Sequence, residues 1–195
     1  MSDISTHISV VGEAVYPHLT KPDVRFNEAG EYKVTLKVAK SDASAMLKVF
    51  DKALDDSLAM AQKEHKGKGI KTAPIPYTIE GDNVFFKFKM KASGVNKKTK
   101  EQFTQRPMLF DAKKNPLPNS ISIWGGSKIK VAFQLRPYFT QLLGAGIVSQ
   151  LKAVQVISLV EGRQLNLFNE EDGFEVTTQE KENEQATEVQ ASSDF

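Results

Sequence analysis

Residues 84–92, VFFKFKMKA, alternate strictly between apolar side chains and lysine from Phe86 onward. Successive side chains of a β-strand point to opposite faces, so this alternation predicts one strand with two different surroundings. The face expected to be dry carries Phe86, Phe88 and Met90. The other face carries ammonium groups about 7 Å apart, the repeat of every second strand residue, on Lys87, Lys89 and Lys91. This second face must meet either water or a polyanion.

Further strands with the same period of two are expected on both sides of this one. Apolar residues stand at every second position from Tyr32 in residues 30–39 and from Ile129 in residues 127–139. Less regular strands are expected over 8–16, with a bulge at Gly12, and over 102–111, 120–126 and 149–160. Proline, glycine and polar turn residues predict loops over 18–23, 72–83 and 111–120.

The period changes after Ser41, where apolar residues recur at helical spacing. They are Met46, Leu47, Phe50, Ala53, Leu54, Leu58 and Ala61. One helix is therefore expected over about 42–66, capped by Ser41 or Asp42 and ended by KGKG at 66–69. Five to seven strands with one inserted helix predict a mainly β fold, and we expect a five-stranded OB-fold barrel, the commonest such barrel that binds extended polyanions. An SH3-like barrel and an α+β sandwich are the alternatives.

The charges of the chain are divided between two segments. Of 26 lysines and arginines and 24 acids, one base and nine acids lie in residues 170–195, so residues 1–169 carry about +10 and the tail about −8. This asymmetry is typical of a polyanion-binding body with an acidic tail. We expect residues 1–169 to form a nucleic-acid-binding domain and residues 170–195, poor in large apolar residues, to be disordered.

Basic residues lie on the face away from the core in three expected strands and one turn. A surface that only confers solubility mixes both signs of charge, yet residues 84–100 hold six lysines and no acid. We therefore expect a polyanion-binding face, although a solvated face guarded by lysine against edge pairing is the alternative. The basic candidates are Lys33, Lys37, Lys87, Lys89, Lys91, Lys97, Lys98, Lys100, Lys128, Lys130 and Arg136.

Aromatic rings decide which polyanion is expected. A groove for single strands combines positive charge with rings on which bases stack, each worth about 1–3 kcal/mol per base. Tyr16 and Tyr138 neighbour prolines in loop-like sequence, and Trp124 precedes Gly125-Gly126, where a ring could be exposed. These three are the stacking candidates. No helix-turn-helix, zinc finger or basic zipper is visible that could carry out direct readout of a duplex.

The sequence offers little support for catalytic or metal chemistry. There is no cysteine, and the three histidines have no metal-ligand spacing. GGSK at 125–128 has the wrong residue order for a phosphate-binding loop and is expected to precede a strand rather than a helix. We expect no cofactor, no metal, no enzymatic activity and no membrane partner.

The sequence resembles the single-stranded DNA-binding proteins of T7-type phages. The resemblance rests on an ordered set of segments: VYPHLTKPD, GEYKVTLKV, FKFKMKAS, KKTKE, GGSKIKV, the RPY segment, GAGIVSQLKAVQVISLVE, and an acidic tail ending in Asp194-Phe195. It implies an OB-fold with an inserted helix that binds single-stranded DNA in phage replication and recombination and anneals strands. It also implies basic contacts at Lys87 and Lys89, at Lys97, Lys98 and Lys100, and at Lys128 and Lys130, with Tyr138 as a groove aromatic.

The resemblance also implies partners and a location. It implies a homodimer supported by the tail, a terminal aromatic that contacts the replicative DNA polymerase and the helicase–primase, and the cytoplasm of the infected bacterial host. Asp194, Phe195 and the terminal carboxylate would form the docking peptide. This tail is more dilute in acid than the family pattern. Because it is tethered to a basic body, we expect it to compete with DNA for the groove, so its removal should tighten binding and admit duplex DNA as well.

Three other functions fit parts of the same sequence. The basic face could bind an acidic protein in a scaffold or virion, or it could position DNA for a metal-dependent nuclease. RNA as the ligand is not distinguished by sequence, because stacking and phosphate contacts suit both nucleic acids.

Overall fold

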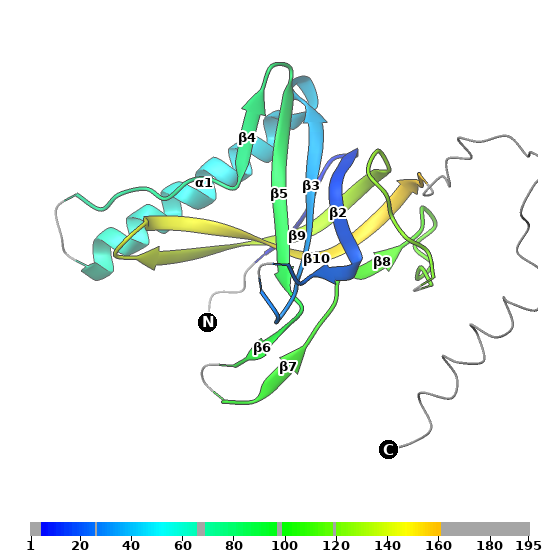
Figure 1. The fold of residues 1–195 in the computed structure, drawn as a ribbon. Coiled ribbons are helices and arrows are strands. Elements are labelled where there is room, and N and C mark those ends of the chain that lie inside the picture. The colour runs from blue at the N-terminus through cyan, green and yellow to red at the C-terminus, as the bar shows by residue number, and fades with distance from the viewer. Residues whose placement is uncertain (1–4, 26, 66–68, 97–98, 119, 161–195) are drawn as a thin grey trace, which may run out of the picture. The chain divides into compact units, whose positions relative to one another are not determined.

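The structure is a computed structural model that describes residues 5–25, 27–65, 69–96, 99–118 and 120–160. The chain divides into a compact unit, Met1–Gly162, and a second unit, Arg163–Phe195. The second unit lies outside the described residues, so the predictions of a domain boundary at 169 and of a disordered tail concern residues that the structure does not describe. The same holds for four predicted site residues: Lys97, Lys98, Asp194 and Phe195. The described part is mainly β with one helix, which confirms the expected class (Figure 1).

The described residues form ten strands and helix α1 (Lys40–His65). The strands are β1 (Thr6–Ile8), β2 (Gly12–Asp23), β3 (Glu31–Ala39), β4 (Tyr77–Glu80), β5 (Asn83–Lys91), β6 (Ser93–Val95), β7 (Gln102–Thr104), β8 (Met108–Phe110), β9 (Lys128–Thr140) and β10 (Gly144–Ser158). No described helix is long and apolar enough to cross a membrane.

Five of the strands pair in a ring. β2 pairs with β3, β3 with β5, β5 with β10, β10 with β9, and β9 again with β2. The β5–β10 pair is parallel and the other four are antiparallel. β2, β3 and β5 stand side by side in Figure 1, with β9 and β10 crossing behind them.

The register of β3 against β5 explains the alternation seen in the sequence. Val34 lies opposite Phe88, and all the predicted inward residues of β3, β5 and β9 are buried. Lys33 lies opposite Lys89 on the other face. A two-residue period therefore sends one set of side chains into the core and lines up the polar set on the outside.

Helix α1 closes one side of the core. Phe50, fully buried, lies with its ring centroid 5.1 Å from that of Phe86 and 5.5 Å from that of Phe133. The buried Ser57 hydroxyl donates a 2.8 Å hydrogen bond to the Gly146 carbonyl on β10. The helix is thus held by an aromatic cluster and by one buried polar contact to a strand.

Two glycines let the connector after α1 lie against the start of β10. A Cβ at Gly144 would stand 1.9 Å from the Lys71 carbonyl oxygen, and one at Gly146 would stand 2.7 Å from the Tyr138 ring. The connector bonds to the strand through Ala73 N–H, which donates to the Ala145 carbonyl at 2.7 Å. Only a residue without a Cβ fits these close approaches.

Several expected element boundaries are wrong. Helix α1 begins at Lys40, whose N–H bonds to the Asp82 carbonyl, so neither Ser41 nor Asp42 precedes the helix as its cap. The last strand begins at Gly144 rather than 149. The loop expected over 72–83 contains β4, which forms a hairpin with β5 across the predicted turn at Gly81.

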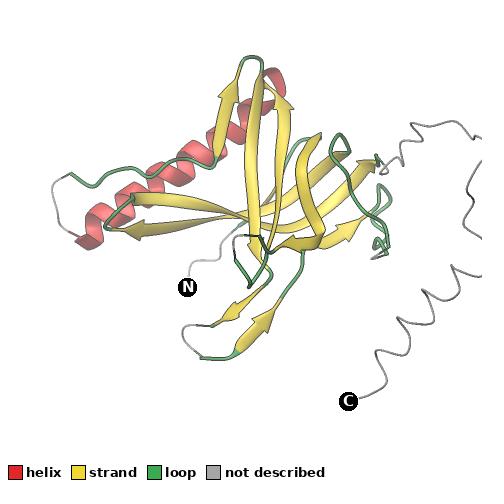
Figure 2. Cartoon of the chain, in the orientation of Figure 1, coloured by secondary structure: helices red, strands yellow, loops and turns green. Residues whose placement is uncertain are grey.

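One segment expected to be a loop is a strand, and one segment expected to be a strand is a loop. Residues 18–23, expected to be a loop, continue β2 because prolines are tolerated where its pairing with β3 is interrupted. The strand expected over 120–126 is a loop (Figure 2), since its backbone bonds within turns, as from Ser127 N–H to the Trp124 carbonyl. The alternation of apolar and polar residues in this segment reflects only the burial of Ile123, not strand pairing.

The strand expected over 102–111 is divided in two. β7 pairs only with β6 in a separate two-stranded sheet, whereas β8 joins β10 in parallel. The buried Pro107 lies between β7 and β8. Proline cannot donate to a ladder, so the strand ends there.

Candidate nucleic-acid interface

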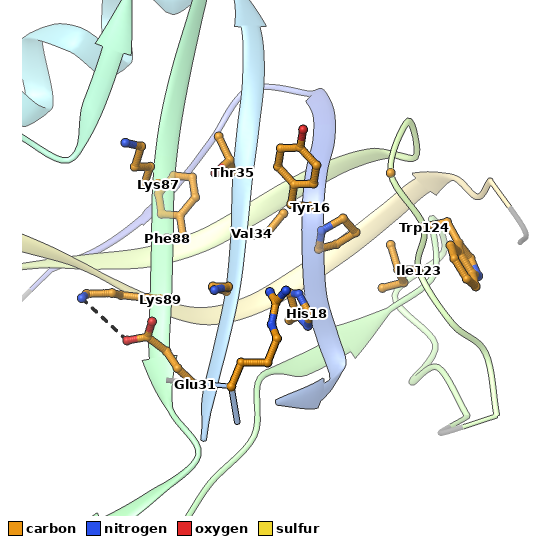
Figure 3. A pocket seen from close by; sticks show the side chains of 14 residues that line it. Tyr16, His18, Glu31, Val34, Thr35, Lys87, Phe88, Lys89, Ile123 and Trp124 are labelled. Carbon is orange, nitrogen blue, oxygen red and sulfur yellow. Dashed lines mark ion pairs between the residues drawn. The ribbon is translucent and has the colours of Figure 1, made fainter. Parts of the chain in front are cut away.

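A hollow of about 740 Å³ lies on the outer face of β2, β3 and β5. Its lysines come from β5 and β3, and its exposed rings come from β2 and from the loop before β9 (Figure 3). It is lined by Tyr16, Pro17, His18, Arg25, Glu31, Lys33, Val34, Thr35, Lys87, Phe88, Lys89, Ile123, Trp124 and Gly125. The structure thus brings together two of the three predicted rings and three of the predicted lysines.

Tyr16 is directed outward by an irregularity of β2. Two residues separate Val15 from His18, whereas only one separates their partners Thr35 and Lys33 on β3, so β2 bulges at this point. Tyr16 has a φ of 48°, a conformation that costs a non-glycine residue about 1–3 kcal/mol and is concentrated at functional sites. Bulges redirect side chains, and the Tyr16 side chain is 82% exposed.

Trp124 is the second exposed ring of the hollow. It is 54% exposed and precedes a turn that passes through Gly126, whose φ is 90°. Gly126 N–H donates to the Ala14 carbonyl at 2.9 Å, which ties this loop to β2. The expected exposure of Trp124 before the two glycines is therefore confirmed, although the segment is a loop and not a strand end.

The lysines of the hollow differ in their carboxylate partners. Lys89 Nζ lies 3.6 Å from Glu31 Oε1, and Lys33 Nζ lies 2.7 Å from Asp23 Oδ2. Lys87 has no carboxylate within ion-pair distance among the described residues. Lys87 is therefore the lysine of this set most directly available to a phosphate.

Asp23 organises the cations at one end of the hollow. Its buried carboxylate accepts hydrogen bonds from Arg25 Nη2 at 2.9 Å and Arg25 Nε at 3.0 Å, in addition to the Lys33 ion pair. His18 Nε2 lies 4.0 Å from Asp23 Oδ2. Hydrogen bonds from Arg25, then from Lys33, hold the pKa of the Asp23 carboxyl far below its usual range. The carboxylate thus fixes two of the cations that line the hollow.

We expect Asp23→Asn to lower the free energy of unfolding in a pH-dependent way. A carboxyl with a depressed pKa contributes its full stability above the unfolded value, about 3.9, and loses it as the pH falls through the folded value. The difference between wild type and variant should be constant from about pH 5 to pH 8 and shrink below about pH 4. Urea unfolding across pH measures it, with Lys87→Ala as a control that should lack this dependence. A difference that grows on acidification would contradict the assignment.

The remaining predicted residues lie outside the 740 Å³ hollow. Tyr138 lines an adjoining hollow of about 400 Å³ that also contains Lys87 and Lys89, so β5 separates two aromatic surfaces. Lys37 lies opposite Glu13 in the register, and Lys128 Nζ lies 3.3 Å from Glu13 Oε2. Six predicted basic residues are absent from the lining of the 740 Å³ hollow: Lys37, Lys91, Lys100, Lys128, Lys130 and Arg136.

Sequence reasoning missed His18, Arg25 and the acids among the lysines. His18 and Asp23 were placed in a loop, and Glu31 is distant in sequence from its partner Lys89. The sequence did contain one local indication for Arg25. An aspartate two residues earlier can accept a hydrogen bond from the arginine's backbone N–H, as Asp23 Oδ1 does from Arg25 at 3.1 Å. The other pairings depend on strand register.

Exposed rings beside cations on the outer face of a β-fold are the combination of groups that binds single-stranded nucleic acid. A family model described as the single-stranded DNA-binding protein of bacteriophage T7 matches residues 11–159, and the chain belongs to this family. Among known sequences, the single-stranded DNA-binding protein of enterobacteria phage T3 is 32% identical over 165 residues, covering 74% of this chain and 71% of that protein. The Escherichia phage T7 protein is 32% identical over 167 residues, with the same coverage.

Solved structures give the same result for the fold. The crystal structure of the single-stranded DNA-binding protein encoded by bacteriophage T7 matches with a TM-score of 0.72 and 29% identity, covering 89% of this chain and 100% of that chain. The single-stranded DNA-binding protein of bacteriophage Enc34 in complex with single-stranded DNA matches with a TM-score of 0.54 and 17% identity, covering 86% of this chain and 89% of that chain. The second match supports the fold alone.

Proposed function

We propose that this protein binds single-stranded DNA without strong sequence preference, in phage DNA replication and recombination. The observation that carries the proposal is the 740 Å³ hollow, which is lined both by the exposed Tyr16 and Trp124 rings and by cations of β5 and β3. Bases would stack on the rings, and Lys87, Lys89 and Lys33 would neutralise phosphates. Family membership supports the same ligand.

The ring of paired strands is, in this proposal, a five-stranded OB-fold barrel with α1 inserted between β3 and β5. An OB-fold is a partly open Greek-key barrel, and the β5–β10 contact, a single parallel pair between Lys89 and Gln150, is its weakest seam. Lys89 therefore lies both in the hollow and beside this seam.

The wider role follows the family resemblance. The protein would coat and anneal single strands in the cytoplasm of the infected host, form a homodimer, and recruit the replicative polymerase and the helicase–primase through Asp194 and Phe195. It would act without enzymatic turnover and without a cofactor. Among the described residues, no cluster of three or more histidine, aspartate or glutamate side chains is placed to hold a metal ion.

Fluorescence titration of labelled poly-dT and a matched duplex across a salt series tests the ligand. If about six phosphates are neutralised, poly-dT affinity should fall by about two to three orders of magnitude between 50 and 200 mM salt. Preference for the single strand is expected from the rings. Weak salt dependence would contradict phosphate binding in the 740 Å³ hollow. Fragmentation of the oligonucleotide on addition of magnesium or manganese would favour a nuclease.

A chain ended at Asn169 tests the role of the acidic tail. Without a tethered segment of about −8 charge, the body should bind poly-dT more tightly and also bind the duplex. A chain of full length with the tail acids replaced by their amides is the matched control and should behave like the shortened one. Equal affinities of the natural and shortened chains would remove the competition from the proposal. Failure of every chain to bind nucleic acid would favour a protein-binding scaffold.

A further inference from the structure

The outer face of β9 and β10 carries a second basic surface that shares no lining residue with the 740 Å³ hollow. An apolar depression of about 300 Å³ lies on it, lined by Ile8, Phe110, Lys114, Lys130, Ala132, Ala153, Val154 and Gln155. β1 borders this face along β9, and β8 borders it along β10. We call it the β9–β10 face.

Cations extend along this face beyond the depression. Lys130 and Arg136 are an even number of residues apart on β9, so their side chains point to the same face, the one away from the core. Lys152 sits at the bulge of β10 that interrupts its pairing with β9. Partial burial, and then the positive charge of nearby Arg136, lower the pKa of Lys152. These two like charges therefore interact unfavourably.

These cations lack the carboxylate partners found elsewhere on the molecule. No described carboxylate lies within ion-pair distance of Lys130, Arg136 or Lys152. The acid beside the depression is Asp111, whose oxygens accept hydrogen bonds from the Lys113 and Asn115 backbone N–H groups and from the Asn115 side chain. Uncompensated cations on a surface favour binding of an anion, because the anion relieves their repulsion.

We propose that the β9–β10 face is a second binding surface for single-stranded nucleic acid, so that one copy of the protein can hold two strands. A base would enter the depression against Phe110 and Ile8, whose side chain is 71% exposed, and phosphates would meet Lys114, Lys130 and Arg136. An extended row of cations beside one ring-lined depression suits a strand with regularly spaced charges better than a compact acidic group. The proposal rests on single-strand binding by the hollow.

Energy transfer between two dT oligomers of about 16 nucleotides, one labelled with a donor and one with an acceptor, tests the second surface. The strands cannot pair with each other, so transfer reports their capture on one protein or assembly. The double variant Lys130→Ala, Arg136→Ala should weaken capture of the second strand by about tenfold or more while leaving the first-strand affinity within about twofold. The matched control is Lys48→Ala, Lys63→Ala on exposed positions of α1.

Each outcome separates this inference from the proposed function. Binding of one strand with no transfer in the wild type would overturn the second surface and leave the hollow intact. Transfer that is equal in the wild type and the double variant would overturn it too, since dimers that carry one strand each would then explain capture. If polyglutamate binding, rather than second-strand capture, is lost in the variant, the face serves an acidic protein and the inference is wrong. Failure of either strand to bind would refute the proposed function itself.

Discussion

Replacing both Tyr16 and Trp124 with alanine is expected to weaken poly-dT binding by about thirtyfold or more. Each stacked base contributes about 1–3 kcal/mol, so two lost platforms remove at least about 2 kcal/mol. Both rings are exposed in the free protein, and no change of conformation is needed to present them. Fluorescence anisotropy at constant salt measures the loss.

Two controls distinguish stacking from charge. Tyr16→Phe and Trp124→Phe keep a ring and should keep most of the affinity. The alanine pair should leave the slope of log affinity against log salt unchanged, whereas Lys87→Ala, Lys89→Ala should reduce that slope by about 1.4, because each phosphate contact on a single strand contributes about 0.7. An alanine pair that binds like the wild type would show that the bases stack elsewhere.

Phe50→Ala is expected to lower the free energy of unfolding by about 3–5 kcal/mol. Phe50 is fully buried, and its ring lies within 6.3 Å, between centroids, of the rings of Phe86, Phe88 and Phe133. Removing it leaves a cavity between α1 and the strands, and the total stability of a domain is only about 5–15 kcal/mol. Urea unfolding followed by circular dichroism measures the change.

The matched control for Phe50 lies on the same helix. Met60 is 48% exposed, so Met60→Ala should change stability by about 0.5 kcal/mol or less. Phe50→Leu keeps much of the buried volume and should fall between the two. A loss below about 1 kcal/mol for Phe50→Ala would mean that α1 is not anchored through this ring.

The regular strands and the helix could be predicted because their cause is local. The alternation from Phe86 to Lys91 and the helical spacing around Phe50 depend only on chain period and burial. Both occur in the structure as predicted, with Phe86 buried and Lys87 exposed. The loop before β9 was mistaken for a strand because Ile123 is buried without forming a ladder, which a period-two pattern cannot distinguish.

The composition of the candidate site could be predicted only in part. Lysines and rings are visible in the sequence, but their distribution over two surfaces depends on the ring of strand pairings. Glu31 reaches Lys89, and Asp23 reaches Lys33, only through strand register. The apparent absence of acids from residues 84–100 therefore overstated the free positive charge of the hollow.

The left-handed backbone of Tyr16 places stability and binding in opposition. Glycine would adopt a φ of 48° without steric cost and would relieve the backbone, but it would remove the ring. Selection of random variants for heat resistance alone should thus favour glycine at position 16 and remove the proposed stacking ring. In the proposed function, the strained backbone at Tyr16 is where the protein gives up part of its stability to present a ring for binding.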